Sequence, residues 1–429
     1  MACTLLPRRA ALAALTLAAA AVSGMVHAAV LQLSPGDDLN IAIAAASSGD
    51  TLQLASGQYP GNLIIDKPLT LQGPEDRSAI IVGERQGRTV WVQSPDVTLR
   101  QLTVSQSGLS LPDMDAGIFL DKTAHEARVE HNDILDNLVG VYIWGPKNAM
   151  VRANRIVGQT GLRVNERGNG VTIWNSPGSQ VLDNHISEGR DGIYSNTSRE
   201  NIFSGNTFIK VRYAVHYMYT NNSEVSNNVS IGNEIAYALM FSKFLTIKGN
   251  IGLNSSHQGL MLNGTQQSSI EENIIDGAEK AVFLYNANLN RIADNVFKNS
   301  EIGVHYTAGS EGNEITGNAF VSNQNQVKYV GTRYLEWSVA GRGNYWSDFS
   351  GFDLNGDGIG DTAYRPNGIM DQVLWRAPAA RLLLNSPAVS IVRWAQTQFP
   401  ALLPGGVMDS APLMAAPDTS TLKKYESLQ

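Results

Sequence analysis

Apolar and polar residues alternate in short runs along most of this chain, and the runs recur with a fixed period over residues 128–330. Each repeat contains two strand-like pieces, for example residues 127–130 and 140–143, separated by a turn. The turn carries an asparagine that returns after 22 or 23 residues, with one step of 30, at Asn132, Asn154, Asn184, Asn206, Asn228, Asn250, Asn273, Asn295 and Asn318. Coils this short cannot bury their own apolar face and must stack. The pattern therefore predicts an all-β fold, a right-handed parallel β-helix of about 22-residue coils over residues 51–330.

The recurring asparagines are expected to form an internal ladder. An asparagine amide can bond the backbone at a turn and stack on the asparagine of the next coil. This predicts a structural role for the asparagines and no catalytic one. Two insertions, at residues 105–115 and 163–168, interrupt the regular coils, and insertions on a solenoid commonly cluster on its binding face.

The N-terminus carries two features that precede the repeats. Residues 1–28 have the pattern of an export signal, because two arginines precede an apolar run at residues 10–22 and a small-residue cleavage site follows; ordinary secretion is favoured over the twin-arginine route. Residues 29–50 are predicted to cap the solenoid with a helix whose apolar stripe contains Leu39, Ile41 and Ile43. Such a cap would cover the strand edges of the first coil.

Three segments are expected after the repeats. Residues 331–380 are rich in Gly, Asp and aromatic residues and resemble a lid over the last coil. Residues 381–429 are predicted to form a helix, started by Ser386 and Pro387, and then an extended arm for partner docking. The polar residues after Pro417 are expected to form a mobile tail.

Charge and cysteine content narrow the functional classes. Removing the two arginines of the signal from 32 basic residues leaves 30 against 39 acidic residues, a net charge of −9. This balance argues against nucleic acid as a partner, since binding phosphates needs Lys and Arg. The single cysteine, Cys3, lies within the signal, so the mature chain would use no thiolate for metal or catalysis. We therefore expect an exported, periplasmic protein.

Strand alternation after each asparagine predicts two outward columns of side chains. One contains Tyr142, Thr172, Tyr194, His216, Ala238, Met261, Phe283 and His305, and the other contains Trp144, Trp174, Asn196, Met218, Met240, Asn263, Tyr285 and Thr307. Imidazole and thioether groups form a soft ligand set that suits Cu(I). The candidate copper ligands are His216, Met218, Met240, Met261 and His305. The alternative is that a covering segment buries this face and the methionines serve as packing.

A second metal candidate lies in the predicted lid. Oxygen-bearing side chains at alternate positions, with Gly at the sixth, are typical of a calcium loop, and here they are Asp353, Asn355, Asp357 and Asp361. Tyr364 stands at the twelfth position, where an EF-hand has a bidentate acid. A structural calcium site and a plain Asp/Gly turn both remain open.

Partner docking is expected at two places. The C-terminal helix presents Pro387, Val389, Val392, Trp394 and Phe399, which are candidates for contact with a membrane subunit or with the open end of the solenoid. Trp144 and Trp174 lie 30 residues apart on one column, where stacked indoles could contact a partner or a sugar.

Several motifs together resemble the NosD family of periplasmic accessory proteins. They are the Asn-marked coils, the block at residues 343–351 that leads into residues 353–361, and the arm at residues 386–395 and 408–410. The resemblance implies a non-enzymatic role in nitrous oxide reductase maturation. It also implies as partners an ABC transporter, made of an ATPase and a membrane subunit that would hold the protein at the inner membrane, and a copper chaperone lipoprotein. The family supplies no copper-ligand motif, so the His/Met set depends on the columns alone.

The rival hypothesis is a carbohydrate-active β-helix protein. A lyase or C5-epimerase would draw its acid and base from Asp113, Asp115, Asp121, Asp183 and Asp191. However, the outward columns show no pair of acids beside an Arg or Lys on adjacent coils. A sugar-binding module that uses Trp144 and Trp174 is a further alternative.

Overall fold

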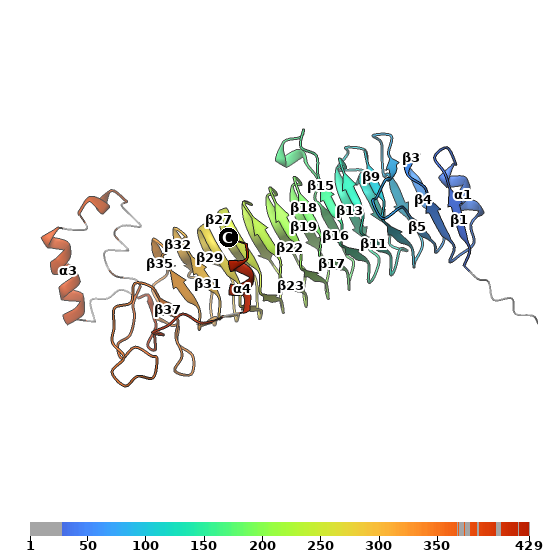
Figure 1. Ribbon diagram of the computed structural model, residues 1–429. Helices are drawn as coiled ribbons and strands as arrows, with labels where there is room; N and C mark the ends of the chain where they lie inside the picture. The colour runs from blue at the N-terminus through green and yellow to red at the C-terminus, as the bar shows by residue number, and fades with distance from the viewer. Residues whose placement is uncertain are drawn as a thin grey trace, which may run out of the picture.

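The computed structural model describes residues 28–366, 368, 373, 378–383, 386–399, 405–418 and 420–428. Parallel strands wind into a right-handed β-solenoid, as predicted, and the coils stack from α1 at one end to β37 at the other (Figure 1). The predicted export signal, apart from Ala28, lies outside the described residues. No helix among the described residues is long and apolar enough to cross a membrane.

Each regular coil contributes one strand to each of three faces. The first face is a 13-stranded sheet of β1 (Val30–Leu33), β2 (Thr51–Leu54), β5 (Thr70–Gln72), β8 (Thr98–Arg100), β11 (Arg128–Glu130), β14 (Met150–Arg152), β17 (Gln180–Leu182), β20 (Ile202–Ser204), β23 (Glu224–Ser226), β26 (Thr246–Lys248), β28 (Ser269–Glu271), β30 (Arg291–Ala293) and β33 (Glu314–Thr316).

The second face follows the asparagine turn. Its strands are β3 (Gly57–Pro60), β6 (Ala79–Val82), β9 (Thr103–Ser105), β12 (Asp133–Leu135), β15 (Arg155–Val157), β18 (His185–Ser187), β21 (Thr207–Ile209), β24 (Val229–Ile231), the first parts of β27 (Ile251–Asn263) and β29 (Ile274–Tyr285), then β31 (Val296–Lys298), β34 (Ala319–Val321) and β37 (Tyr345–Trp346).

The third face carries the predicted columns. Its strands are β4 (Leu63–Ile65), β7 (Val90–Val92), β10 (Ala116–Leu120), β13 (Val139–Trp144), β16 (Val171–Trp174), β19 (Asp191–Asn196), β22 (Tyr213–Met218), β25 (Ile235–Met240), the second parts of β27 and β29, β32 (Ile302–Thr307) and β35 (Asn325–Val330). The prediction of two strands per coil was therefore wrong. The missed strand is only three residues long and directly follows the asparagine, so its alternation merged with the turn.

The asparagine ladder runs through the interior of the solenoid. Asn206 is fully buried, and its backbone N–H and its Nδ2 group donate to Asn228 Oδ1 at 2.9 and 3.0 Å. The same Nδ2 group also donates to the carbonyl oxygen of Val181 at 2.8 Å. The same pattern repeats from Asn132 to Asn318, which confirms the predicted ladder.

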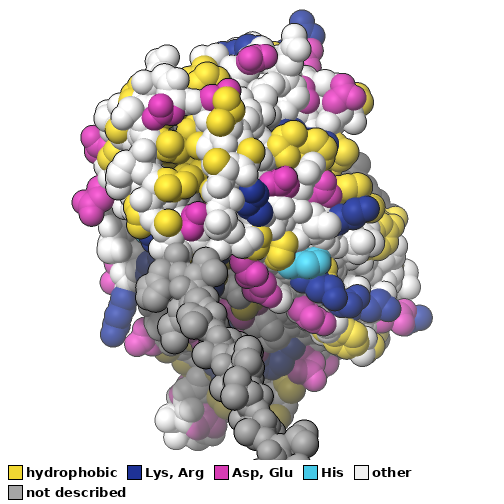
Figure 2. All heavy atoms as spheres, turned by 90° about the vertical axis from the view of Figure 1, so that its right-hand side faces the viewer, with side chains coloured by type: hydrophobic (Ala, Val, Ile, Leu, Met, Phe, Trp, Pro, Cys, Tyr) yellow, Lys and Arg dark blue, Asp and Glu magenta, His cyan; other side chains and the backbone are white. Residues whose placement is uncertain are grey.

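The N-terminal cap differs in detail from the prediction. Helix α1 (Leu39–Ala45) buries Leu39 and Ile43, and the carboxylate of Asp38 caps its first turn. Ile41 is 68% exposed, so its place on the buried stripe was wrong, because a seven-residue helix turns only one narrow face inward. Strand β1 precedes α1 and pairs with β2. At this end of the molecule acidic and basic side chains are interspersed with hydrophobic ones (Figure 2).

The C-terminal arm closes the other end of the solenoid. Strand β38 (Val407–Met408) pairs with β36 (Leu335–Glu336), and the carboxylate of the buried Asp409 accepts hydrogen bonds from the backbone N–H of Asn344 and from Trp346 Nε1. Asn344 is itself the acceptor for Asn318, so Asn344 and Asp409 are two further steps of the ladder. The sequence analysis missed both.

The expected mobile tail is a helix, which corrects that prediction. Helix α4 (Ser420–Glu426) packs Leu422 and Tyr425 on an outward aliphatic column of the second face, formed by Val229, Ile251, Ile274, Val296 and Ala319 (Figure 1). Tyr425 Oη donates to Asp276 at 2.5 Å, and the ammonium of Lys298 lies 4.3 Å from the Tyr425 ring centroid. Burial of the apolar surface of Leu422 and Tyr425 against this column thus stabilises the docked position of α4, although most of its sequence is polar.

Three further helical segments complete the described chain. The insertion at residues 163–168 contains η1 (Val164–Glu166), which protrudes from the edge of the solenoid (Figure 1). Segment η2 (Pro378–Leu383) precedes α3 (Pro387–Gln398), whose N-cap is Ser386 as predicted. In Figure 1, α3 lies beyond the last coil.

Candidate functional site

Strand pairing defines which side chains neighbour one another on the third face. Tyr194, His216, Ala238 and Met261 are successive partners in one column, and Asn196, Met218, Met240 and Asn263 are successive partners in the next. Tyr217 is fully buried, so the alternation has the predicted phase. The column containing His216 is only partly exposed, however, because Thr172 and Ala238 are buried.

The four candidate ligands on β22, β25 and β27 surround one small residue. His216 and Met261 are the cross-strand partners of Ala238, one on each side. Met240 lies two residues further along the strand of Ala238 on the same face, and Met218 is its partner on β22. The strands are about 4.8 Å apart. We call this set, with one imidazole and three thioethers around a single methyl group that is itself 0% exposed, the Ala238 hollow.

A buried carboxylate orients His216. Asp191 is 2% exposed, and its Oδ2 lies 3.0 Å from His216 Nδ1. Arg212 donates to the same carboxylate from Nε and Nη2, each at 2.8 Å. Burial alone would raise the pKa of Asp191, but the hydrogen bonds from His216 and Arg212 outweigh burial and lower the pKa. The carboxylate is therefore ionised and only accepts, so Nδ1 of His216 donates to Asp191 and Nε2 is the ring nitrogen left for a ligand.

His305 lies outside the hollow. It follows Met261 and Phe283 along the column, two strands beyond Met261, so the five predicted ligands do not form a single site. Its Nδ1 atom is buried without a hydrogen-bond partner. Burial, followed by the positive charges of Lys328 and Lys280, lowers the pKa of His305 to about 4.

We expect this pKa to appear as a pH dependence of stability. The folded protein holds His305 neutral, whereas the unfolded chain titrates near a pKa of about 6.5. The unfolded state therefore binds more protons between these values, and the free energy of unfolding decreases as the pH falls from about 6.5 toward 4. Thermal unfolding at pH 7 and pH 5 should show a larger loss for the wild type than for His305→Gln. Equal losses in the two proteins would contradict the assignment.

The predicted calcium loop is held by its own hydrogen bonds. The carboxylate of Asp353 accepts from the backbone N–H groups of Gly356 and Gly358 at 2.6 and 2.8 Å, and Asp361 accepts from Leu354 at 2.7 Å. Among the described residues no group of three or more His, Cys, Asp or Glu side chains is arranged to hold a metal ion. The geometry is that of an Asp/Gly turn and gives calcium no support.

The predicted partner-binding residues occupy two separate surfaces. Trp144 and Trp174 stack with ring centroids 5.8 Å apart at an interplanar angle of 19°, and Trp174 is 40% exposed. On α3, Trp394 and Phe399 are exposed, Pro387 is exposed and Val392 half-buried, whereas Val389 is buried.

The aspartates considered for a lyase or epimerase mostly serve local structure. Asp113 and Asp115 accept hydrogen bonds from Ser110, Asp121 accepts from Trp91 Nε1, and Asp183 lies in an exposed ion pair with Arg152. Asp191 contacts both Arg212 and His216, and His216 belongs to an outward column. The sequence analysis missed this contact because Asp191 and Arg212 lie 21 residues apart on adjacent coils.

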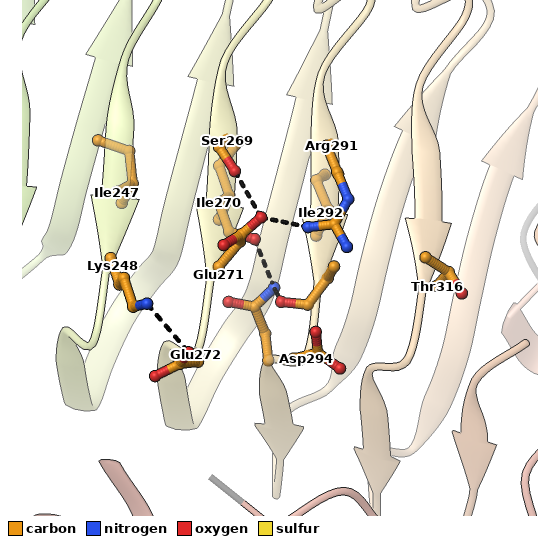
Figure 3. A network of polar contacts seen from close by, with 12 residues as sticks. Ile247, Lys248, Ser269, Ile270, Glu271, Glu272, Arg291, Ile292, Asp294 and Thr316 are labelled. Atoms are coloured by element: carbon orange, nitrogen blue, oxygen red, sulfur yellow. Dashed lines mark hydrogen bonds and ion pairs between the residues drawn. The ribbon is translucent and has the colours of Figure 1, made fainter. Parts of the chain in front are cut away.

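The first face presents a different chemistry. Lys248 pairs with Glu272 at 3.1 Å, Arg291 pairs with Glu271, and Ser269 Oγ donates to Glu271 at 2.7 Å (Figure 3). Such partly exposed pairs contribute little to stability. The described ion pairs of this part of the first face thus contrast with the imidazole and thioether groups of the third face.

Two curated relatives align with most of the chain. "Probable ABC transporter binding protein NosD" of Stutzerimonas stutzeri is 40% identical over 389 residues, which cover 87% of this chain and 89% of the relative. The protein of the same name from Pseudomonas aeruginosa PAO1 is 39% identical over 378 residues, which cover 85% and 88%. The chain belongs to the NosD family. The family model described as "Periplasmic copper-binding protein (NosD)" matches residues 152–351, which include the whole Ala238 hollow.

Solved structures share the solenoid of this NosD-family chain. The family 28 exopolygalacturonase of Yersinia enterocolitica has a TM-score of 0.57 and 10% identity, and covers 71% of this chain and 77% of its own. The A-module of mannuronan C-5 epimerase AlgE6 of Azotobacter vinelandii has a TM-score of 0.51 and 16% identity, and covers 69% and 92%. These likenesses establish the fold alone. Family membership supports a periplasmic, copper-related role.

Proposed function

We propose that this NosD-family protein accepts Cu(I) in the Ala238 hollow and positions it for nitrous oxide reductase. The observation that carries the proposal is the register that places His216, Met218, Met240 and Met261 around Ala238. Copper is here the cargo. Thioethers are soft, exchangeable ligands, and imidazole is a common copper ligand. Ligands that exchange readily are suited to a scaffold that has to release the metal it binds.

The Asp191 contact supports the choice of His216 as a ligand. A metal-binding histidine almost always donates its other ring N–H to a carboxylate or carbonyl, which fixes the ring and its tautomer. His216 has this arrangement through Asp191. Nε2 is then the nitrogen that would bind copper. Asp191, itself held by Arg212, fixes the ring through Nδ1 and leaves Nε2 available.

Family membership and the exposed residues of α3 support a proposal about the partners. An ABC transporter, made of an ATPase and a membrane subunit, would hold the protein at the inner membrane, and a copper chaperone lipoprotein would supply the metal. The exposed Trp394 and Phe399 of α3 are the proposed contacts with the membrane subunit. Aromatic side chains are enriched among the residues that dominate binding energy at protein interfaces. In this role the protein is an accessory scaffold and not an enzyme.

An anaerobic Cu(I) titration against a chromogenic chelator tests the site. We expect the wild type to bind one Cu(I), and Met218→Leu/Met240→Leu to weaken binding by about tenfold or more, because leucine keeps the volume and removes the sulfur. Met150→Leu on the first face is the matched control and should bind as the wild type does. Absence of binding in the wild type, or equal affinity in the double variant, would refute copper carriage in the hollow.

A further inference from the structure

A groove crosses the corner between the third and the first face. It has a volume of about 420 Å³ and is lined by residues of four successive coils: Gly145, Lys147, Asn175, Pro177, Thr197, Ser198, Arg199, Tyr219 and Asn221. We call it the Lys147 groove. It shares no side chain with the Ala238 hollow, so what it binds is independent of the copper proposal.

The groove is basic in an acidic protein. Lys147 and Arg199 are the charged residues of its lining, which contains no Asp or Glu. The chain as a whole has a net charge of −7, so a lining with two cations and no acid is a local exception. Arg199 has one ion pair, from Nε to Glu200 at 3.5 Å, and both side chains are mostly exposed, so this contact is weak and exchangeable. The charge favours an anionic ligand, and guanidinium is suited to a carboxylate.

Uncharged polar groups fill the space between the cations. Asn175 and Asn221 provide amides, whereas the hydroxyls of Thr197 and Ser198 already donate to Asn196 Oδ1 at 2.8 Å and to the carbonyl oxygen of Ser176 at 2.7 Å. Asn221 Oδ1 accepts the backbone N–H of Lys243 at 2.9 Å, which leaves its Nδ2 group as the donor of that side chain. The two amides lie two coils apart, or about 9.6 Å, and match a ligand that offers hydroxyl groups at regular intervals.

Aromatic rings flank the groove at both ends. Tyr219 is 53% exposed and stacks on Phe241 with ring centroids 5.3 Å apart and an interplanar angle of 18°. At the other end Trp144 and Trp174 immediately precede Gly145 and Asn175. Flat, exposed aromatic rings pack well against the C–H face of a pyranose, because the ring face is apolar while the polar residues around it can contact the sugar hydroxyls.

We infer that the Lys147 groove binds a linear saccharide whose units carry carboxylates, with the carboxylates at Lys147 and Arg199 and a sugar ring against Tyr219. An acidic peptide would satisfy the two cations, but it would offer the amides of Asn175 and Asn221 no hydroxyl partners and Tyr219 no sugar ring. The volume accommodates a short segment of such a chain, and the lining residues come from four successive coils.

Calorimetric titration of the full mature protein with oligogalacturonate and oligomannuronate tests the inference. We expect saturable binding that weakens with added salt, and a loss of about tenfold in affinity for each of Lys147→Gln and Arg199→Gln. Tyr219→Ala should weaken binding without changing its salt dependence. Lys243→Gln, a cation at the same corner but outside the lining, is the matched control and should behave as the wild type.

Three results would overturn the inference. They are the absence of saturable uronate binding, equal binding of a poly-glutamate peptide of the same charge, and unchanged affinity in both Lys147→Gln and Arg199→Gln. Neutral cello-oligosaccharide should bind much more weakly than either uronate, and equal binding would remove the role of the two cations. Because none of these variants lies in the Ala238 hollow, Cu(I) affinity should be unchanged in all of them, which separates this inference from the copper proposal.

Discussion

Replacing Asp409 with alanine is expected to lower the free energy of unfolding by about 2–3 kcal/mol. The carboxylate accepts from the backbone N–H of Asn344 at 2.7 Å and from Trp346 Nε1 at 2.8 Å, and both donors are buried. Alanine would leave these donors without a partner at the end of the ladder. Chemical denaturation, followed by the fluorescence of the buried Trp337 and Trp346, measures the loss.

Asp409→Asn is the matched control for this change. It keeps an oxygen for Asn344 and Trp346 and removes a buried charge. Burial raises the pKa of Asp409 despite the hydrogen bonds it accepts, so the ionised form is disfavoured in the folded protein. The stability that Asp409 contributes is therefore greatest at low pH and falls as the pH rises through its folded pKa. We expect Asp409→Asn to remain close to the wild type. A loss as large as that of Asp409→Ala would show that the charge itself is needed.

Filling the Ala238 hollow should abolish copper binding without removing a ligand. Ala238 is fully buried, so in Ala238→Phe the new ring must displace His216 and Met261 from their present positions, and we expect the Kd for Cu(I) to rise by about a hundredfold, or about 2.7 kcal/mol. Residue 238 points away from the core but is fully buried, so the ring must displace the neighbouring methionines, and we expect this overpacking to lower the free energy of unfolding by about 1–3 kcal/mol without preventing folding. Competition with a Cu(I) chelator gives the affinity, and circular dichroism checks the fold.

Ala238→Ser provides the comparison for the larger ring. Serine is close to alanine in size and leaves the hollow open, so its copper affinity should stay near that of the wild type. Retention of tight binding in Ala238→Phe would show that copper binds elsewhere. His305, whose neutral ring lies two strands beyond Met261, would then be the next candidate.

The solenoid and the outward columns could be predicted from local sequence. The asparagine period fixes the coil length, and once Tyr217 faces inward, His216 and Met218 must face outward. The grouping of the ligands around Ala238 could be recognised only from the register between strands, because the ligands His216 and Met261 lie on the two coils adjacent to that of Ala238. Sequence spacing placed His305 in the same column as His216 and Met261, and the register shows that Phe283 lies between His305 and Met261.

The contacts that could not be predicted join segments distant in sequence. Asp409 caps a ladder whose previous step, Asn344, is 65 residues away. Lys424 Nζ donates to the carbonyl oxygen of Asn227, which is 197 residues away in sequence. The polar sequence of α4 gives no indication of this contact. The aliphatic residues under α4 can be seen in the sequence. That they point outward follows only from the strands of the second face, which the prediction of two strands per coil omitted.

The docking of α4 also determines where mechanical load enters the molecule. The chain leaves the last coil, passes through the arm at residues 405–418 and is fastened again beside Asn227 and Asp276, many coils back from the end. A force applied at residue 428 would therefore act first on the flank of the solenoid, and the last coils would be loaded only after α4 had detached. A fluorescent protein or affinity tag fused there would accordingly report from the side of the molecule and not from its tip.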